Sequence, residues 1–154
     1  MKNLTMGAAC VAALVLVAGC ATGPGNSGRP SETGGGPVNE LVGTTWELTL
    51  VNMPGDKRLP VDRPEDYRLV FAEETRLVVT ADGNQCVGLY NSAGRALSVR
   101  LDCPLASGFP PGSVGKEFLA ILSAATRFGM TGSGDEMYID ATAGRASLNF
   151  LRVR

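Results

Sequence analysis

The sequence predicts a mainly β domain, a small antiparallel sheet of about eight strands that curls into a barrel-like shape with one helix. Three observations support this fold class. Short runs rich in β-branched and aromatic residues recur between residues 45 and 152. Most connections between them are short, which favours antiparallel neighbours. A single segment has the apolar spacing of a helix, and it is expected to plug or cover one end of the barrel.

The first 19 residues are predicted to be a lipoprotein signal peptide. Lys2 precedes an apolar run over residues 6–18, which is too short to span a bilayer. The run ends in Val17-Ala18-Gly19-Cys20, which resembles the bacterial lipobox, so we expect Cys20 to be lipidated. Cleavage of a plain secretory signal near Gly19 or Ala21 is the alternative. The predicted location is the periplasmic side of the outer membrane, with the membrane as a partner through the lipid anchor.

Residues 20–37 are expected to form a disordered tether, because Gly, Ser, Pro and Thr dominate there. As a flexible coil this tether would hold a domain at 38–154 roughly 20 to 25 Å from the membrane. The chain carries 14 basic and 15 acidic residues without a block of like charge. Nucleic acid is therefore not an expected partner, since its binding requires a basic surface.

The cysteines predict one disulfide. Cys10 would leave with the signal peptide and Cys20 would carry lipid, so Cys86 and Cys103 remain as the pair in an oxidising compartment. Closing this loop is worth about 3 kcal/mol in the chain-entropy model. A metal site on two thiolates is the alternative, but it would need further ligands and the chain has no histidine. We expect no metal and no cofactor other than the lipid on Cys20.

The first half of the domain is predicted to consist of strands and one long loop. Residues 45–51 alternate in polarity, which predicts a strand with Trp46, Leu48 and Leu50 facing inward. An irregular loop is expected at 52–66 because of its prolines and Pro54-Gly55. A hairpin is predicted from 67–71 and 75–80. A second hairpin is predicted from 83–103, with a turn at 91–94 and the disulfide across it.

The second half contains the predicted helix. No regular element is expected at 104–112, which holds three prolines. The helix is predicted at 113–125 with Ser113 as the N-cap. Its apolar stripe consists of Val114, Phe118, Ile121, Leu122 and Ala125. Three strands, 127–130, 136–140 and 146–152, close the chain.

At Asn84-Gln85-Cys86-Val87-Gly88-Leu89-Tyr90 the chain resembles the META domain, the family that includes the heat-shock protein HslJ and many exported bacterial lipoproteins. The resemblance covers nearly all of 41–154. Its further features, in order, are Trp46, Leu69 and Phe71, Cys103, Glu117-Phe118 with Leu122, Tyr138, and Leu148 with Phe150. The threonine that usually precedes the second cysteine is missing from 99–103. The resemblance implies a conical barrel with one helix, no known catalytic residues, and a link to envelope stress or antibiotic tolerance.

Candidate catalytic groups are few, and we expect no enzyme. Ser113 and Lys116 match the Ser-x-x-Lys of penicillin-interacting enzymes, but the other motifs of that class are missing. The absence of histidine excludes a Ser-His-Asp or Cys-His arrangement. The carboxylate pairs at 62–66, 73–74 and 135–136 are expected to be solvated. Gly83 and Gly88 are interpreted as a turn and as a bulge or barrel bend. Trp46 and Tyr90 are interpreted as core aromatics whose polar tips find partners.

Three functions remain open on the sequence. The first is a non-enzymatic binding or structural module of the cell envelope with an envelope protein as its partner. The second is an inhibitor of a cell-wall lytic enzyme such as lysozyme, in which the loop at 52–66 or 104–112 would enter the enzyme's cleft. The third is a carrier of a small apolar ligand inside the barrel, which requires an interior that side chains leave unfilled.

Overall fold

The computed structural model describes residues 39–104, 108–141 and 145–154. These residues belong to one compact unit, Gly36–Arg154. The predicted signal peptide at 1–19, the lipidation site Cys20 and the tether at 20–37 lie outside the described residues, so these predictions stay untested.

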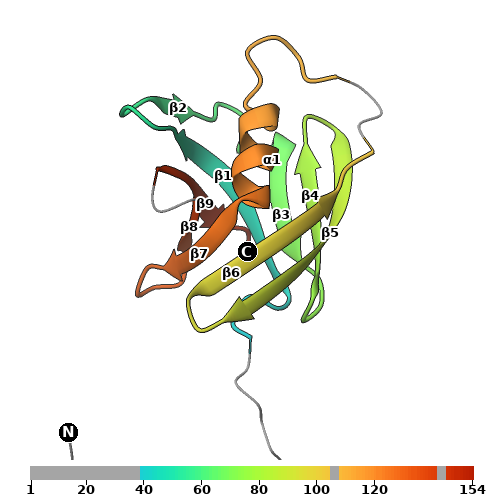
Figure 1. Cartoon of the computed structure of the whole chain (residues 1–154), viewed down its shortest axis with the longest axis vertical. Coiled ribbons are helices and arrows are strands. Elements are labelled where there is room, and N and C mark those ends of the chain that lie inside the picture. Colours follow the sequence, from blue (N-terminus) through green and yellow to red (C-terminus); the bar gives the residue numbers. More distant parts are fainter. Residues whose placement is uncertain (1–38, 105–107, 142–144) are drawn as a thin grey trace, which may run out of the picture. The chain divides into compact units, whose positions relative to one another are not determined.

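Nine strands, one α-helix and one short 3₁₀ helix make up the described residues. In chain order they are β1 (Thr44–Asn52), β2 (Arg58–Pro60), the 3₁₀ helix η1 (Pro64–Asp66), β3 (Tyr67–Phe71), β4 (Arg76–Ala81), β5 (Asn84–Ala93), β6 (Ala96–Asp102), α1 (Gly115–Ser123), β7 (Ala125–Met130), β8 (Glu136–Ala141) and β9 (Ala146–Arg152) (Figure 1).

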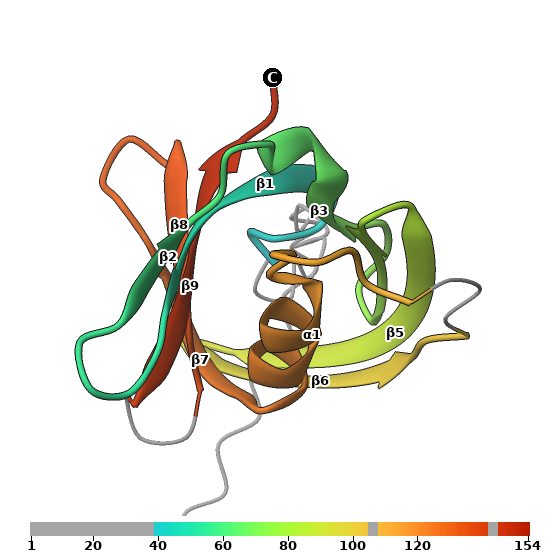
Figure 2. The same cartoon turned by 90° about the horizontal axis from the view of Figure 1, so that it is seen from above.

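Eight of the strands form a closed antiparallel barrel. Neighbours follow the order β1-β3-β4-β5-β6-β7-β8-β9, and β9 pairs again with β1 to close the ring (Figure 2). The ninth strand, β2, adds to the end of β1, where Val51 lies opposite Leu59. The predicted mainly β fold, its antiparallel barrel and its single α-helix are therefore confirmed. Closure gives each of the eight strands of the ring two neighbours.

The seam between β6 and β7 is the thinnest part of the ring. Ala96 opposite Arg127 is the one paired position between these strands, and the Phe128 amide adds a bond to the Arg95 carbonyl at 3.0 Å. Helix α1 packs against β6, β8 and β9, and Figure 2 shows it within the ring of strands. Most of β6 has no hydrogen-bonded partner on β7, and the contacts of α1 with β6 cover this side of the strand.

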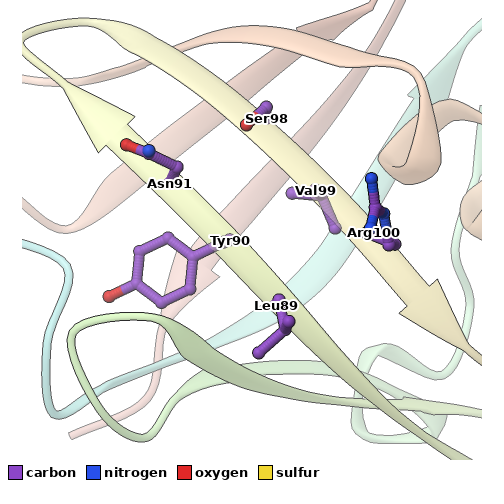
Figure 3. A pocket seen from close by; sticks show the side chains of 6 residues that line it. All are labelled: Leu89, Tyr90, Asn91, Ser98, Val99 and Arg100. Carbon is purple, nitrogen blue, oxygen red and sulfur yellow. The ribbon is translucent and has the colours of Figure 1, made fainter.

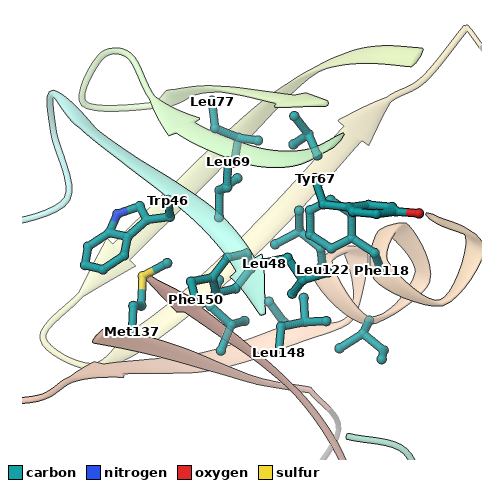
Figure 4. Packing of buried hydrophobic residues seen from close by; sticks show 14 of the residues in the cluster. Trp46, Leu48, Tyr67, Leu69, Leu77, Phe118, Leu122, Met137, Leu148 and Phe150 are labelled. Carbon is teal, nitrogen blue, oxygen red and sulfur yellow. The ribbon is translucent and has the colours of Figure 1, made fainter. Parts of the chain in front are cut away.

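Side chains fill the interior of the barrel. The five largest fully buried side chains are aromatic and come from β1, β3, β7, β9 and the helix. They are Trp46, Phe71, Phe118, Phe128 and Phe150. Trp46, Phe118 and Phe150 are labelled in Figure 4. All five residues of the stripe predicted for the helix are buried, three of them on the helix itself. Edge-to-face contacts join Phe118 to Tyr67 and to Phe150, with ring centroids 6.1 and 6.2 Å apart.

Several boundaries differ from the prediction. In β1 the pairing register shifts between Leu48 and Leu50, so Val51 is buried and Leu50 is half-exposed. This bulge interrupts the strict alternation that placed Leu50 inward. The loop at 52–66 is less irregular than expected, because it contains β2 and η1. Strand β5 continues to Ala93, so the turn expected at 91–94 is shorter. The helix ends at Ser123, and Ala125 already belongs to β7.

Candidate functional site

The helix end of the barrel carries a polar network centred on Asp82. Asp82 and Gly83 form the two-residue turn between β4 and β5, with φ of 50° and 77°. Two consecutive positive φ values are typical of the type I′ turn, and Asp-Gly is among its preferred sequences. The turn predicted at Gly83 is confirmed. It holds the Asp82 carboxylate in front of the first residues of α1.

Two hydroxyl groups converge on this carboxylate. Tyr67 Oη donates a hydrogen bond to Asp82 Oδ1 at 2.7 Å and lies 3.3 Å from Ser113 Oγ. Ser113 Oγ donates to Asp82 Oδ2 and accepts a hydrogen bond from the Gly115 amide at 2.8 Å. Burial is the main reason that the pKa of Tyr67 is raised, and its hydrogen bond to Asp82 acts in the same direction. The network thus links β3, the β4–β5 turn and the start of α1.

A pocket of about 250 Å³ opens beside this network. It brings together residues of 60–66 and of 110–112, which belong to the two loops that were considered from the sequence as able to enter an enzyme's cleft. Its walls are Pro60, Val61, Asp62, Arg63 and Asp66 from the first loop, Pro110, Pro111 and Gly112 from the second, and Tyr67, Asp82, Ser113 and Val114. The Arg63 guanidinium bonds to Asp66 at the rim. The described parts of the two loops that line this pocket therefore form one surface.

The geometry around Ser113 fits structural support better than nucleophilic catalysis. Its hydroxyl is engaged by Asp82 and Gly115, and within the described residues no contact joins it to the Lys116 side chain. A nucleophilic serine needs a base within hydrogen-bond reach to take its proton. The predicted N-cap is displaced by one position, because Val114 occupies the cap. Ser113 still accepts the Gly115 amide, which is one of the unpaired donors of the helix start.

Four residues that carry the resemblance stated above, Trp46, Asn84, Gly88 and Tyr90, lie in β1 and β5, and most point into the barrel. Trp46 is buried and its Nε1 donates to Thr44 Oγ1 at 2.7 Å. Tyr90 is buried and its Oη donates to the Glu73 carbonyl at 2.9 Å. Both were expected as core aromatics with satisfied polar tips, and both are. Asn84 is buried at the start of β5.

Gly88 was predicted to mark a bulge or a barrel bend, and the bulge is not present. The pairing of β5 with β4 and β6 is regular through Gly88, so there is no bulge. A Cβ at this position would lie 2.8 Å from Leu101 Cδ2 and 2.9 Å from the Arg100 carbonyl oxygen. The glycine is needed because neighbouring side chains pack over its backbone, a contact that local sequence does not reveal.

Cys86 and Cys103 form the predicted disulfide, with their Cα atoms 4.3 Å apart. The bond joins β5 to the residue that follows β6, and Cys86 is fully buried. Among the described residues no group of His, Cys, Asp and Glu side chains is arranged to hold a metal ion. No helix in the described ranges has the length and apolar character needed to cross a membrane.

The carboxylate pairs considered from the sequence are separate from the pocket's centre, apart from Asp62 and Asp66 at its wall. Glu73 and Glu74 are exposed in the β3–β4 turn, as expected. Asp135 is half-exposed, and a hydrogen bond from Arg154 holds its pKa below the usual range. Each therefore has a solvent contact or an ion-pair partner rather than the buried environment of a general acid.

Sequence reasoning missed the central residue, Asp82, and the role of Tyr67 beside it. The Asp82-Gly83 dipeptide between two β-rich runs was a local signal for the turn. No local signal predicted that this turn approaches Ser113, because Asp82 and Ser113 are 31 positions apart in the sequence.

Comparisons with known proteins support the fold alone. No family model matches the chain, and no curated protein matches it. Two solved structures are similar. An NMR structure of a protein from Burkholderia xenovorans is 18% identical, with a TM-score of 0.62, over 73% of this chain and 83% of that one. A crystal structure of a DUF4847 family protein from Bacteroides vulgatus is 11% identical, with a TM-score of 0.56, over 73% of this chain and 94% of that one.

Proposed function

We propose that this chain is a META-type lipoprotein of the bacterial envelope, held at the periplasmic side of the outer membrane by lipid on Cys20. In this proposal it is not an enzyme, and it acts by contacts of its surface with an envelope protein under envelope stress or antibiotic exposure. The filled barrel interior is the observation that favours surface contacts. The lipobox and the META-like motif of β5 support the location and the family.

Packing inside the barrel argues against carriage of an apolar ligand. A small barrel can hold a ligand only where its inward side chains leave room. Here Trp46, Phe118 and Phe150 are fully buried in the centre (Figure 4). The pocket at the Asp82 network lies at one end of the barrel and is lined mainly by loop residues. Binding by this protein is therefore expected at its surface.

Lipidation is tested by fractionation and mass spectrometry. The exported protein is expected to begin at Cys20 with acyl chains attached, and Cys20→Ser is expected to move it from the membrane to the soluble fraction. The matched control is Cys10→Ser, which alters a cysteine of the predicted signal peptide and should leave the distribution unchanged. An unacylated, soluble wild-type protein would contradict the proposed anchor.

The proposed partner is tested by crosslinking in intact envelopes, followed by deletion of the gene under envelope stress. A specific crosslinked protein and a stress phenotype that the wild-type gene restores are the expected results. Recovery of no partner together with an unchanged phenotype would contradict the proposal.

Inhibition of a cell-wall lytic enzyme is the second candidate. The specific observation for it is the single surface formed by residues of 60–66 and of 110–112, with Arg63 exposed at the rim. Such a surface could enter a substrate cleft. The test is the rate of cell-wall hydrolysis by lysozyme at micromolar concentrations of the protein, with Arg63→Ala as the variant. An unchanged rate would eliminate this candidate.

A further inference from the structure

The outer surface of β4, β5 and β6 exposes an unusual apolar cluster. Leu89 is 60% exposed and Val87 is 45% exposed, and both point outward because the alternate residues of β5 are buried. Val78 on β4 lies directly opposite Val87 and is half-buried. We call the surface formed by Arg76, Val78, Val87, Leu89 and Arg100 the Leu89 face.

Two arginines flank the centre of this face. Leu89 lies opposite Arg76 on β4 and opposite Arg100 on β6. None of the ion pairs in the described part of the chain involves Arg100, and Arg76 has one at 3.7 Å with exposed Glu73. An exposed pair of that length contributes little. Asp102, opposite Val87, is the acidic neighbour on β6.

The surface around Leu89 is hollowed along β6. One pocket of about 250 Å³ is lined by Leu89, Tyr90, Asn91, Ser98, Val99 and Arg100 (Figure 3). A second of the same volume lies on the other side of Leu89, over Val87, Gly88, Leu101 and Asp102. Leu89 therefore stands between two shallow depressions, each of which Arg100 also lines.

The described residues begin close to β5. Asn39 Nδ2 donates a hydrogen bond at 3.0 Å to Tyr90 Oη, and the Tyr90 side chain points into the barrel, on the opposite side of the strand from its neighbour Leu89. Asn39 is also 19 residues after Cys20 in the sequence. A flexible chain of that length spans about 24 Å on average. A membrane that held Cys20 would thus be within reach of the Leu89 face.

We propose that the Leu89 face rests on the phospholipid headgroup layer of the membrane that carries the Cys20 anchor. Leu89 and Val87 enter the interface, and Arg76 and Arg100 bind lipid phosphates. A guanidinium suits phosphate because it donates in a fork of parallel hydrogen bonds. The attraction need not be strong, since a short tether gives an effective concentration in the millimolar range. This inference rests on the proposed anchor, which supplies that tether.

A second exposed leucine provides a natural contrast. Leu151 on β9 is 49% exposed, but its neighbours across the strands are Glu47 on β1 and Glu136 on β8. Glu47 is itself paired with Arg68 at 2.7 Å, and Glu136 would repel the phosphates of a lipid surface, so the residues that flank Leu151 do not offer phosphate the two arginines that flank Leu89. Exposure is therefore similar at the two leucines while the flanking side chains differ in charge, which makes Leu151→Ser the matched control for Leu89→Ser.

The experiment attaches the protein to vesicles chemically, so it does not depend on acylation by the cell. The chain from Cys20 to Arg154, which keeps the whole compact unit, is coupled through the Cys20 thiol to a maleimide lipid. The vesicles contain phosphatidylethanolamine and phosphatidylglycerol. The rate at which phenylglyoxal modifies each arginine is then measured by mass spectrometry for the coupled and the free protein.

Phenylglyoxal is expected to modify Arg76 and Arg100 about fivefold more slowly in the coupled protein, because the tether keeps the Leu89 face on the membrane for most of the time. Arg58 on β2, away from this face, should change by less than twofold. Leu89→Ser should remove the protection and Leu151→Ser should keep it. Equal rates at Arg100 in the coupled and free protein, or protection that survives Leu89→Ser, would overturn the inference. Absence of acylation in cells would instead contradict the proposed anchor.

Discussion

Ser113 offers the sharpest test of the network at the helix end. Its hydroxyl donates to the Asp82 carboxylate and accepts the Gly115 amide at 2.8 Å. A hydrogen bond to a charged group contributes about 1.5 to 3 kcal/mol and a neutral one about 1 kcal/mol. Ser113 is half-buried, so we take the lower part of this range. Ser113→Ala is expected to lower the free energy of unfolding by about 2 kcal/mol.

The interaction itself is measured by a double-mutant cycle with Asp82→Ala. Asp82 has a positive φ, so alanine there adds backbone strain of about 1 kcal/mol. That cost, and the loss of the Tyr67 hydrogen bond to Asp82, occur in both arms of the cycle and cancel. The coupling energy left between Ser113 and Asp82 is expected to be about 1 to 2 kcal/mol.

Urea unfolding of the oxidised protein, followed by Trp46 fluorescence, gives the four free energies of the cycle. Lys116→Ala is the control, because its side chain is exposed and the proposal gives it no role in the network. It should change stability by less than about 0.5 kcal/mol. Additive effects of Ser113→Ala and Asp82→Ala would refute the network as a unit that fixes the helix to the barrel.

Other perturbations test the staple, the packing and the titration of this barrel. Replacing both Cys86 and Cys103 by alanine should lower the free energy of unfolding in urea by about 3 kcal/mol, because the disulfide no longer closes a loop between residues 17 positions apart. Free thiols detected in the exported wild-type protein would contradict this. Gly88→Ala should cost about 1 to 3 kcal/mol by overpacking, whereas Gly132→Ala, with nothing within 4 Å of its Cβ, should be neutral in the same assay. Burial raises the pKa of Tyr67 above its usual value of 10.0, so its contribution is complete below pH 10 and is lost as the pH rises further through the folded-state pKa. Tyr67→Phe should therefore flatten the fall in unfolding free energy above pH 10, and an equally steep fall in that variant would exclude Tyr67 as its source.

The helix and the hairpins were predictable because their signals are local. The spacing of Val114, Phe118 and Ile121 places them on one side of a helix whatever surrounds it, and all three are buried. Tyr90 was likewise interpreted as a core aromatic from its residue type within the predicted hairpin, and it is buried. Leu50 shows where such a signal fails, because a bulge depends on how β1 pairs with β9.

The candidate site was predictable only in part. Loops 52–66 and 104–112 were recognised from their prolines, and Ser113 was singled out at the helix start. Their meeting around Asp82 depends on closure of the barrel, which brings the β4–β5 turn to the helix. The Leu89 face is a similar case, since Arg76 and Arg100 flank Leu89 only after three strands pair in register.

The sequence by itself determined the eight strands of the ring and the helix, though not β2, and the pairing of Cys86 with Cys103, because periodicity and cysteine chemistry act over short stretches or on few candidates. Tertiary structure alone decided the closure of β1 on β9, the close packing over Gly88, and the charges beside Leu89 and Leu151. The physical reason is that strand register sets which distant residues meet, and register is fixed by burial of the whole barrel interior at once.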